Sequence, residues 1–225
     1  MTHQRFLIVD LGSQYAQRIA RRVRELRCYA EIVMPDVAPS QVADAQGLIL
    51  SGSPHSAYDP EAPGVDPAIF EQGTPVLGIC YGMQLMSKLL GGEVGAAHAR
   101  EYGPALVDVV EDGAELLAGL GDQAHVWMSH GDRVERPPAS FEAIASTSSA
   151  PYAAVRHREK RLYGVQFHPE VTHTPRGSEI LRNFLYGICG AVGDWRMSSF
   201  IDEAVASIRT RVGSDRVICG LSGGV

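Results

Sequence analysis

The sequence lacks any long run of apolar residues. No segment approaches the roughly 20 consecutive apolar residues that a membrane-spanning helix needs, although apolar residues make up 45% of the 225 positions. Residues 1–5 carry no signal-peptide pattern and lead directly into a strand-like segment. We therefore expect neither a membrane protein nor a secreted protein, and we expect a cytoplasmic location.

Cysteine and positive charge are also scarce. The four cysteines lie far apart, without a CxxC pair or a Cys/His cluster: Cys28, Cys80, Cys189 and Cys219. This spacing suits a reducing compartment and argues against a disulfide framework or a structural zinc site. The formal net charge is −6 at pH 7, whereas a nucleic-acid-binding protein needs a basic surface. We expect a globular domain with no bound metal and no nucleic-acid partner.

Buried strands alternate with helices in the first 92 residues. Apolar strand-like segments cover residues 6–9, 29–34, 47–50 and 75–79, with helical spacing at 16–26 and 83–90. Such alternation predicts an α/β fold, a doubly wound and mostly parallel sheet with helices on both faces. Five β-rich segments then predict an antiparallel extension, and a helix follows at 176–188. The five segments are 102–110, 125–128, 141–147, 152–156 and 162–167.

A domain boundary is predicted near residues 193–195, which leaves a main domain at residues 1–194. Apolar residues recur at helical spacing between 201 and 212, and Ser199 with Asp202 fits a capping box at the start of that helix. Residues 216–219 read as the first strand of a new unit. We expect residues 195–225 to form a linker helix and the truncated start of a second domain.

The segment from Gly78 to Gly82 has the form glycine–x–cysteine–x–glycine at a predicted junction between a strand and a helix. This is the pattern of a nucleophile elbow, with cysteine in place of serine. The glycines permit a sharp turn, and the positive end of the following helix favours a thiolate at Cys80. The backbone N–H of Tyr81 is free to bind an oxyanion. The alternative is a small cysteine that only fills space in the core.

A second polar motif follows the predicted strand at residues 163–167. His168 and Glu170 are two residues apart, so their side chains leave an extended backbone on the same face. A histidine base and the carboxylate that orients it can therefore share one strand end. Taken alone, the motif is more simply a polar surface turn; together with the cysteine elbow it indicates a catalytic triad.

Three segments together resemble the class I, triad-type glutamine amidotransferases: GICYGMQ at residues 78–84, VQFHPEV at 165–171 and LSGSP at 50–54. The resemblance covers essentially the whole chain and implies the flavodoxin-like fold of that family. It also implies that Cys80 attacks the amide carbon of glutamine to form a thioester. His168 would transfer the protons, and Glu170 would fix the tautomer of His168.

The resemblance assigns further roles around the triad. The oxyanion hole would be formed by Tyr81, Gly52 and Ser53. The α-amino and α-carboxyl groups of the substrate would be bound by Gln84, Ser129, His130 and Gly131. The family usually has glycine at position 53, and a serine there is strained only if the loop requires a positive φ.

Other segments, among them WMSHGD at 127–132, are most similar to the branch of the family that supplies ammonia for the amination of XMP to GMP in purine biosynthesis. That branch implies a synthetase (ATP-pyrophosphatase) domain that uses ATP and Mg, a homodimer, and a glutaminase step without a cofactor. Ser222, Gly223 and Gly224 would begin its pyrophosphate-binding loop, which is incomplete here. Two alternatives stay open: an amidotransferase for anthranilate or carbamoyl phosphate synthesis, and a catalytically silent docking domain.

Overall fold

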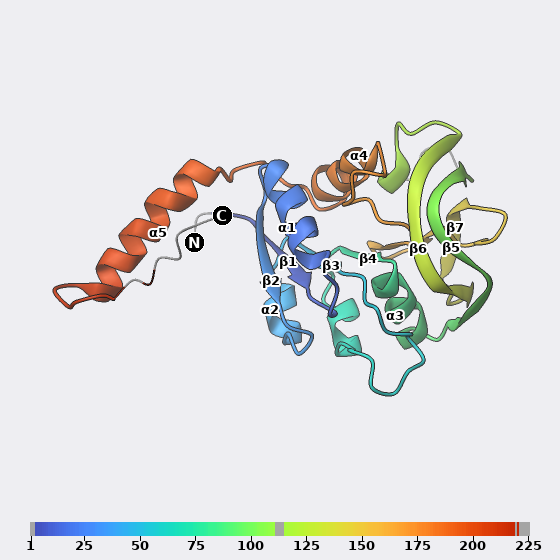
Figure 1. Cartoon of the computed structure of the whole chain (residues 1–225), viewed down its shortest axis with the longest axis horizontal. Helices are drawn as coiled ribbons and strands as arrows, with labels where there is room; N and C mark the ends of the chain where they lie inside the picture. The colour runs from blue at the N-terminus through green and yellow to red at the C-terminus, as the bar shows by residue number, and fades with distance from the viewer. Residues whose placement is uncertain (1–2, 111–114, 219, 221–225) are drawn as a thin grey trace.

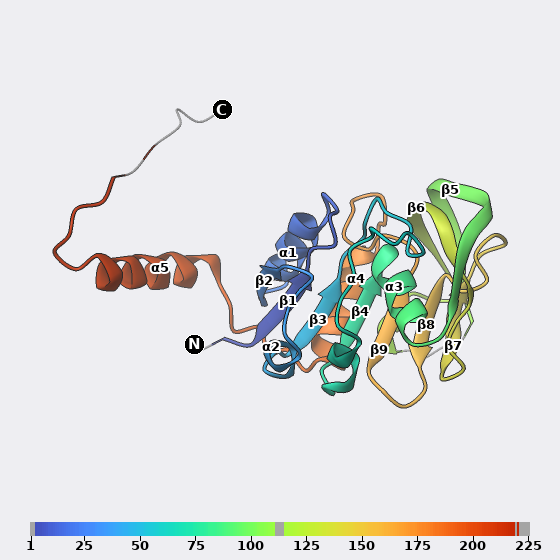
Figure 2. The ribbon, with the colours of Figure 1, turned by 90° about the horizontal axis from the view of Figure 1, so that it is seen from below.

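The structure, a computed structural model, describes residues 3–110, 115–218 and 220. Within these residues, one sheet has the strand order β2-β1-β3-β4-β9-β8-β7-β5-β6. Helices cover both sides of its first half, and helix α5 projects away from this body (Figure 1 and Figure 2). No helix among the described residues is long and apolar enough to cross a membrane.

The parallel half of the sheet consists of β1 (Arg5–Val9), β2 (Tyr29–Val33), β3 (Gly47–Leu50), β4 (Val76–Ile79) and β9 (Leu162–Val165). Every residue of β3, β4 and β9 is buried. Strands covered on both faces need such unbroken apolar runs. The carboxyl ends of these central strands lie side by side and carry the site described below.

Two separate apolar cores fill the two faces of the parallel half. Helices α1 (Ala16–Glu25) and α4 (Gly177–Arg182) pack on one face. Helices α2 (Pro39–Ala43) and α3 (Tyr81–Leu89), with the 3-10 turn η1 (Pro67–Glu71), pack on the other. This arrangement confirms the doubly wound fold that the sequence predicts.

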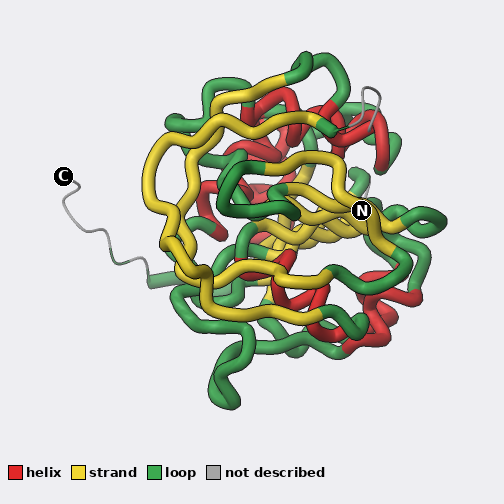
Figure 3. The backbone as a smooth tube through the Cα atoms, turned by 90° about the vertical axis from the view of Figure 1, so that its right-hand side faces the viewer, coloured by secondary structure: helices red, strands yellow, loops and turns green. Residues whose placement is uncertain are grey.

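The antiparallel half consists of β5 (Glu93–Val109), β6 (Gln123–Arg136), β7 (Phe141–Ser146) and β8 (Ala154–His157). A short 3-10 turn, η2 (Glu115–Leu117), precedes β6. Figure 3 views the molecule from this side, with the long curved strands in front. The extension confirms the predicted antiparallel flank.

One strand was assigned to the wrong half by the sequence pattern. Residues 162–167 were predicted as part of the antiparallel extension, but β9 pairs parallel with β4 and antiparallel only with β8. All four residues of β9 are buried. A strand covered on both faces is suited to the centre of the parallel half and not to a half-exposed antiparallel extension. Its register sets Gly78 opposite Gly164 and Ile79 opposite Val165.

The predicted helix at 176–188 is present in two parts. Helix α4 continues directly into a π-helical segment, η3 (Asn183–Ile188), whose apolar residues lie in the same core as α1. The following segment is tied to the body by a hydrogen bond from Trp195 N to the Arg27 carbonyl oxygen at 3.1 Å.

Helix α5 (Met197–Val212) confirms the helix predicted beyond this point but not its cap. Its N-cap is Arg196, so Ser199 lies inside the helix and the predicted capping box is wrong. A capping residue must have non-helical dihedrals, and Ser199 is already helical. Residues 216–218 are irregular rather than a strand, and Cys219 lies outside the described residues.

Candidate active site

Cys80 forms the sharp turn between β4 and α3. Its φ is 52° and its ψ is −107°, a conformation that costs a side-chain-bearing residue about 1–3 kcal/mol. Glycines make the turn possible: a Cβ on Gly78 would lie 2.6 Å from Met83 N, and one on Gly82 would overlap the Leu50 carbonyl. The Cys80 N–H donates to the Val165 carbonyl oxygen at 2.7 Å. The elbow geometry predicted from the glycine pattern is therefore present.

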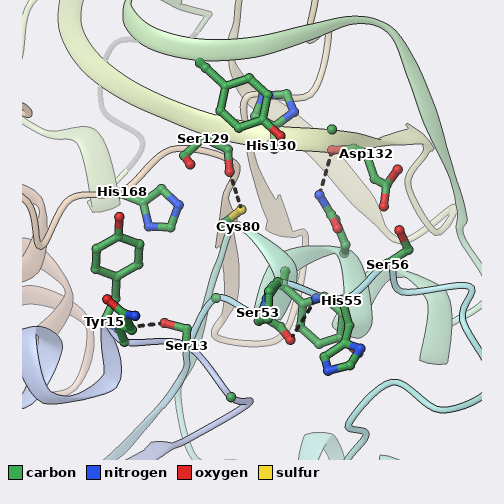
Figure 4. A pocket seen from close by; sticks show the side chains of 18 of the residues that line it. Ser13, Tyr15, Ser53, His55, Ser56, Cys80, Ser129, His130, Asp132 and His168 are labelled. Carbon is green, nitrogen blue, oxygen red and sulfur yellow. Dashed lines mark hydrogen bonds between the residues drawn. The ribbon is translucent and has the colours of Figure 1, made fainter.

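The sulfur of Cys80 is almost completely buried, with 5% of the residue exposed. It lies 3.8 Å from the Ser129 carbonyl oxygen and 3.6 Å from Gln166 Nε2. Figure 4 shows Ser129 and His168 on two sides of the sulfur. Because Cys80 is the N-cap of α3, the free N–H groups of the first helical turn place partial positive charge beside it.

His168 follows the end of β9 and is held on every side. Its Nδ1 donates to Glu170 Oε1 at 2.7 Å, which leaves Nε2 for the sulfur and for substrate. Its backbone N–H donates to the Trp127 carbonyl oxygen at 3.0 Å, and its own carbonyl accepts from Thr174 Oγ1 at 2.6 Å. The Tyr15 ring packs against the imidazole, with 5.1 Å between the ring centres.

The electrostatics of His168 favour its charged form. Burial opposes protonation, but the Cys80 sulfur and the Glu170 carboxylate outweigh it and raise the His168 pKa to about 11. Opposite charges stabilise each other strongly where water is excluded, and Glu170 Oε1 lies only 2.7 Å from His168 Nδ1. The Cys80 sulfur therefore faces a His168 side chain that favours the imidazolium form.

The loop after β3 lies against the imidazole. A Cβ on Gly52 would come within 3.3 Å of His168 Cε1, so a larger residue at position 52 would push the ring. Among the described residues, only Arg27 and Cys80 combine a side chain with a positive φ. Ser53 therefore adopts an ordinary conformation, in which its Oγ accepts from His55 N at 3.3 Å. The strain considered for Ser53 is absent here.

Strand β6 forms the opposite wall of the site with Ser129, His130 and Gly131. His130 is 4% exposed and its Nε2 lies 2.9 Å from Glu101 Oε2. Burial lowers the pKa of His130, although the Glu101 carboxylate opposes this. Glu101 also accepts a hydrogen bond from Ser149, which ties this wall to the loop between β7 and β8.

Gln84 lies on the first turn of α3 and has both amide hydrogens in use. Its Nε2 donates to the Asp132 carbonyl oxygen at 2.8 Å and to Gln166 Oε1 at 3.2 Å. The carbonyl can only accept, so this contact fixes the orientation of the amide. Oε1 of Gln84 therefore remains as an acceptor for a ligand.

These residues surround a cavity of about 770 Å³, within the usual range for small-molecule sites. Tyr58 spans part of it, with its hydroxyl 3.1 Å from Asp132 Oδ1. The side chains and backbone that line it come from five segments (Figure 4): residues 12–15, 52–58, 80–84, 129–132 and 168, with Ala96 and Tyr102.

The structure gathers most of the site residues predicted from the sequence. All of the proposed triad, oxyanion and substrate-binding residues, except the buried Glu170 behind His168, line this one cavity. Cys28 and Cys189 are buried elsewhere in the core. The predicted pyrophosphate-loop residues Ser222, Gly223 and Gly224 lie outside the described residues.

Sequence reasoning missed several residues of the site. Tyr15, Glu101 and Thr174 were given no role in the site from the sequence, although Glu101 and Thr174 lie in segments that share the family resemblance. Gln166 did carry a signal, because a glutamine between apolar residues, two positions before His168, shares its strand face.

Comparisons with known proteins agree with this site. The family profile described as glutamine amidotransferase class-I matches residues 7–188. The glutamine-hydrolyzing GMP synthase of Caldanaerobacter subterraneus subsp. tengcongensis is 51% identical over 221 residues, which cover 97% of this chain and 43% of that protein. The protein of the same name from Thermomicrobium roseum is 52% identical over 221 residues, covering 97% of this chain and 41% of that protein. The chain thus spans less than half the length of these relatives.

Solved structures show the same architecture. A protein from Thermoplasma acidophilum, described as one subunit of a GMP synthase, superimposes with a TM-score of 0.71 at 28% identity and covers 91% of this chain and 99% of its own. A glutamine amidotransferase from Thermotoga maritima superimposes with a TM-score of 0.66 at 20% identity, over 85% of this chain and 100% of its own, and shows the fold alone. From the profile match over most of its length, we conclude that this chain belongs to the class-I glutamine amidotransferase family.

Proposed function

We propose that this chain hydrolyses L-glutamine to glutamate and ammonia through a thioester on Cys80. The observation that carries the proposal is the buried sulfur facing an imidazolium whose Nδ1 is held by Glu170 at 2.7 Å. A core cysteine that only fills space needs neither a positive φ nor a charged partner. The Glu170 contact supports the proposal over the docking-domain alternative.

In the first half of the reaction, the Cys80 thiolate attacks the amide carbon of glutamine. The carbonyl oxygen becomes negative and is held by the N–H of Tyr81 and by the Gly52–Ser53 loop. His168 donates its proton to the leaving nitrogen, the C–N bond breaks, and ammonia departs. The product is a glutamyl thioester and a neutral imidazole.

In the second half, neutral His168 takes a proton from water, and the hydroxide attacks the thioester carbon. The C–S bond breaks, glutamate leaves, and Cys80 returns to its thiolate form beside an imidazolium. One water is consumed for each glutamine, so the atoms balance. Glu170 keeps Nδ1 protonated throughout, which directs Nε2 at the reacting atoms.

We propose that the head group of glutamine lies beside Gln84 and residues 129–131, which line the cavity. Oε1 of Gln84 can accept from the α-ammonium, since Nε2 is already bonded to Asp132 and Gln166. The backbone of residues 129–131 faces the same space and offers groups for the α-carboxylate. We expect no cofactor for this reaction.

We further propose that the ammonia serves the amination of XMP to GMP. Support comes from the curated relatives named GMP synthase, which are about twice as long as this chain. Their additional length is proposed to hold an ATP-pyrophosphatase domain that binds ATP, Mg and XMP, in a cytoplasmic homodimer. Under this proposal residues 1–194 are the glutaminase domain, and residues 195–225 link it to that second domain.

The direct test is a reaction of the chain with L-glutamine, followed by measurement of glutamate and ammonia. Intact-protein mass spectrometry should detect a glutamyl adduct on Cys80. Cys80→Ala should lose both the adduct and ammonia release, whereas Cys28→Ala, a buried cysteine away from the cavity, should keep them. Full activity in Cys80→Ala would contradict the proposal.

A further inference from the structure

Gln166 is a fully buried amide that touches the reactive sulfur. Its relative exposure is 0%, and its Nε2 donates to Cys80 Sγ at 3.6 Å. Its Oε1 accepts from Gln84 Nε2 at 3.2 Å. Burying an amide is costly unless it is hydrogen-bonded, and both polar atoms of this amide find their partners in the active site.

The Asp132 carbonyl, acting through Gln84, determines which polar atom of the Gln166 amide faces Cys80. The Asp132 carbonyl can only accept, so Gln84 must present Nε2 to it, at 2.8 Å. The second hydrogen on Gln84 Nε2 then meets an acceptor, which must be Oε1 of Gln166. Gln166 is left with Nε2 toward Cys80, as a donor to the sulfur.

We propose that Gln166 positions the Cys80 sulfur and stabilises its thiolate form by donating a hydrogen bond, and that Gln84 holds Gln166 in the donating orientation. The inference deepens the proposed function and rests on Cys80 being the nucleophile. A donor to an ionised acceptor forms a stronger bond than a donor to a neutral one, so the amide favours thiolate over thiol. Unlike His168, the amide does not exchange its proton during the reaction.

Several ionisable groups share the cavity with the sulfur, and all of them remain when Gln166 is replaced. They come from every segment packed around Cys80: Tyr15, His55, Tyr58, Tyr81, Tyr102, His130, Asp132 and His168, with Glu170 behind His168 and Glu101 behind His130. A change of pH profile between the protein and a Gln166 variant therefore reports the loss of the amide.

The test compares Gln166→Met, which removes the donor, with Gln166→Glu, which also adds negative charge. The rate of Cys80 alkylation by iodoacetamide is measured against pH without glutamine, with the labelled site identified by mass spectrometry. For Gln166→Met we expect the half-maximal pH of alkylation to rise by about one unit, so that alkylation slows by about tenfold at pH values below the midpoint of the unmodified protein. For Gln166→Glu the half-maximal pH of Cys80 alkylation should rise further. At high pH the alkylation rates of the unmodified protein and of both variants should converge.

Gln72→Glu is the matched control. Gln72 Nε2 donates to the Ala68 carbonyl oxygen at 2.8 Å, beside η1 and at the opposite end of β4 from Cys80. The same chemical change there should leave the pH profile unaltered. Folded Gln166 variants with the profile of the unmodified protein would overturn the inference. Absence of glutamine hydrolysis and of Cys80 labelling in the unmodified protein would instead contradict the proposed function.

A second measurement needs no change at a buried position. In unmodified protein labelled with ¹⁵N, the Gln166 side-chain amide signal should shift with the same pH midpoint as Cys80 alkylation. The shift should vanish in Cys80→Ala. A signal that stays constant across that pH range would also overturn the inference, even if both Gln166 variants failed to fold.

Discussion

Cys80 occupies a region of conformational space that disfavours any residue with a Cβ, with φ at 52°. The turn is closed by glycines on either side, and α3 starts immediately after it, so the backbone cannot relax. The strain presents the sulfur to the cavity at the end of β4. Function and stability therefore conflict at this single residue.

This conflict can be measured with two substitutions. Cys80→Gly should abolish glutamine hydrolysis and raise the free energy of unfolding by about 1 kcal/mol, because glycine accepts the positive φ. Cys80→Ala should abolish hydrolysis without that gain, because alanine keeps the Cβ. Chemical denaturation of both proteins checks the difference. Equal stability of the two variants would contradict the strain.

The charge of His168 predicts a pH-dependent stability. The folded pKa of about 11 lies above the ordinary value of 6.5, so its contribution is complete below about pH 6.5 and is lost as pH rises toward 11. His168→Asn lacks this contribution. The difference in unfolding free energy between the two proteins should therefore shrink across that window, as followed by denaturation at several pH values. A constant difference would show that the charge contributes nothing.

The triad residues could be predicted from the sequence because each one belongs to a short local pattern. The cysteine lies between two glycines, and His168 and Glu170 share one strand end. The role of Thr174 could not be assigned in this way, because it depends on Trp127, which is far away in the chain. Gln166 lies near His168 in the sequence, but its partners Cys80 and Gln84 are also far away. Thr174, for example, accepts from Trp127 N and donates to the His168 carbonyl.

At the scale of elements, the first turn of α3 packs directly against β3. A Cβ on Gly82 would overlap the Leu50 carbonyl, which belongs to the backbone and cannot move aside. Gly82→Ala should therefore lower the free energy of unfolding by about 1–3 kcal/mol or more and reduce glutamine hydrolysis. Gly187→Ala, with open space around the added methyl group, is the control and should change neither. Thermal unfolding and an ammonia assay provide the measurements.

Strand pairing was harder to predict than the elements themselves. The four strands and the two longer helices of the first 90 residues follow from apolar periodicity, and the parallel arrangement of the strands follows from the alternation. The short helix α2 and the 3-10 turn η1 were not predicted. The place of β9 beside β4 does not follow from the pattern, because the partners are more than 80 residues apart and a short apolar run has no preferred neighbour. The cap of α5 also escaped prediction, since Ser199 and Asp202 match the motif one turn too late.

At the scale of the whole molecule, the part of α5 whose side chains the structure describes, from Val205 to Arg211, is exposed. Val205 and Ile208 on this helix are 40% and 58% exposed, and the last described tie to the body is at Trp195. Deleting residues 197–225 should therefore leave the melting temperature within about 2 °C and the glutamine hydrolysis unchanged. A large fall in the melting temperature would contradict the predicted boundary at residues 193–195.

The pairing of β9 with β4 has a consequence for when the active site can form during synthesis and folding of the chain. Cys80 follows β4 directly and His168 lies three residues after β9, so the two residues lie beyond the ends of two paired strands. In the sequence, however, β9 comes after the four antiparallel strands β5 to β8. A chain synthesised only as far as β8 contains Cys80 but lacks His168, so under the proposed function it cannot hydrolyse glutamine. Under the proposed function, glutamine hydrolysis therefore requires that β9 has paired with β4, and ammonia release would indicate that the sheet has formed.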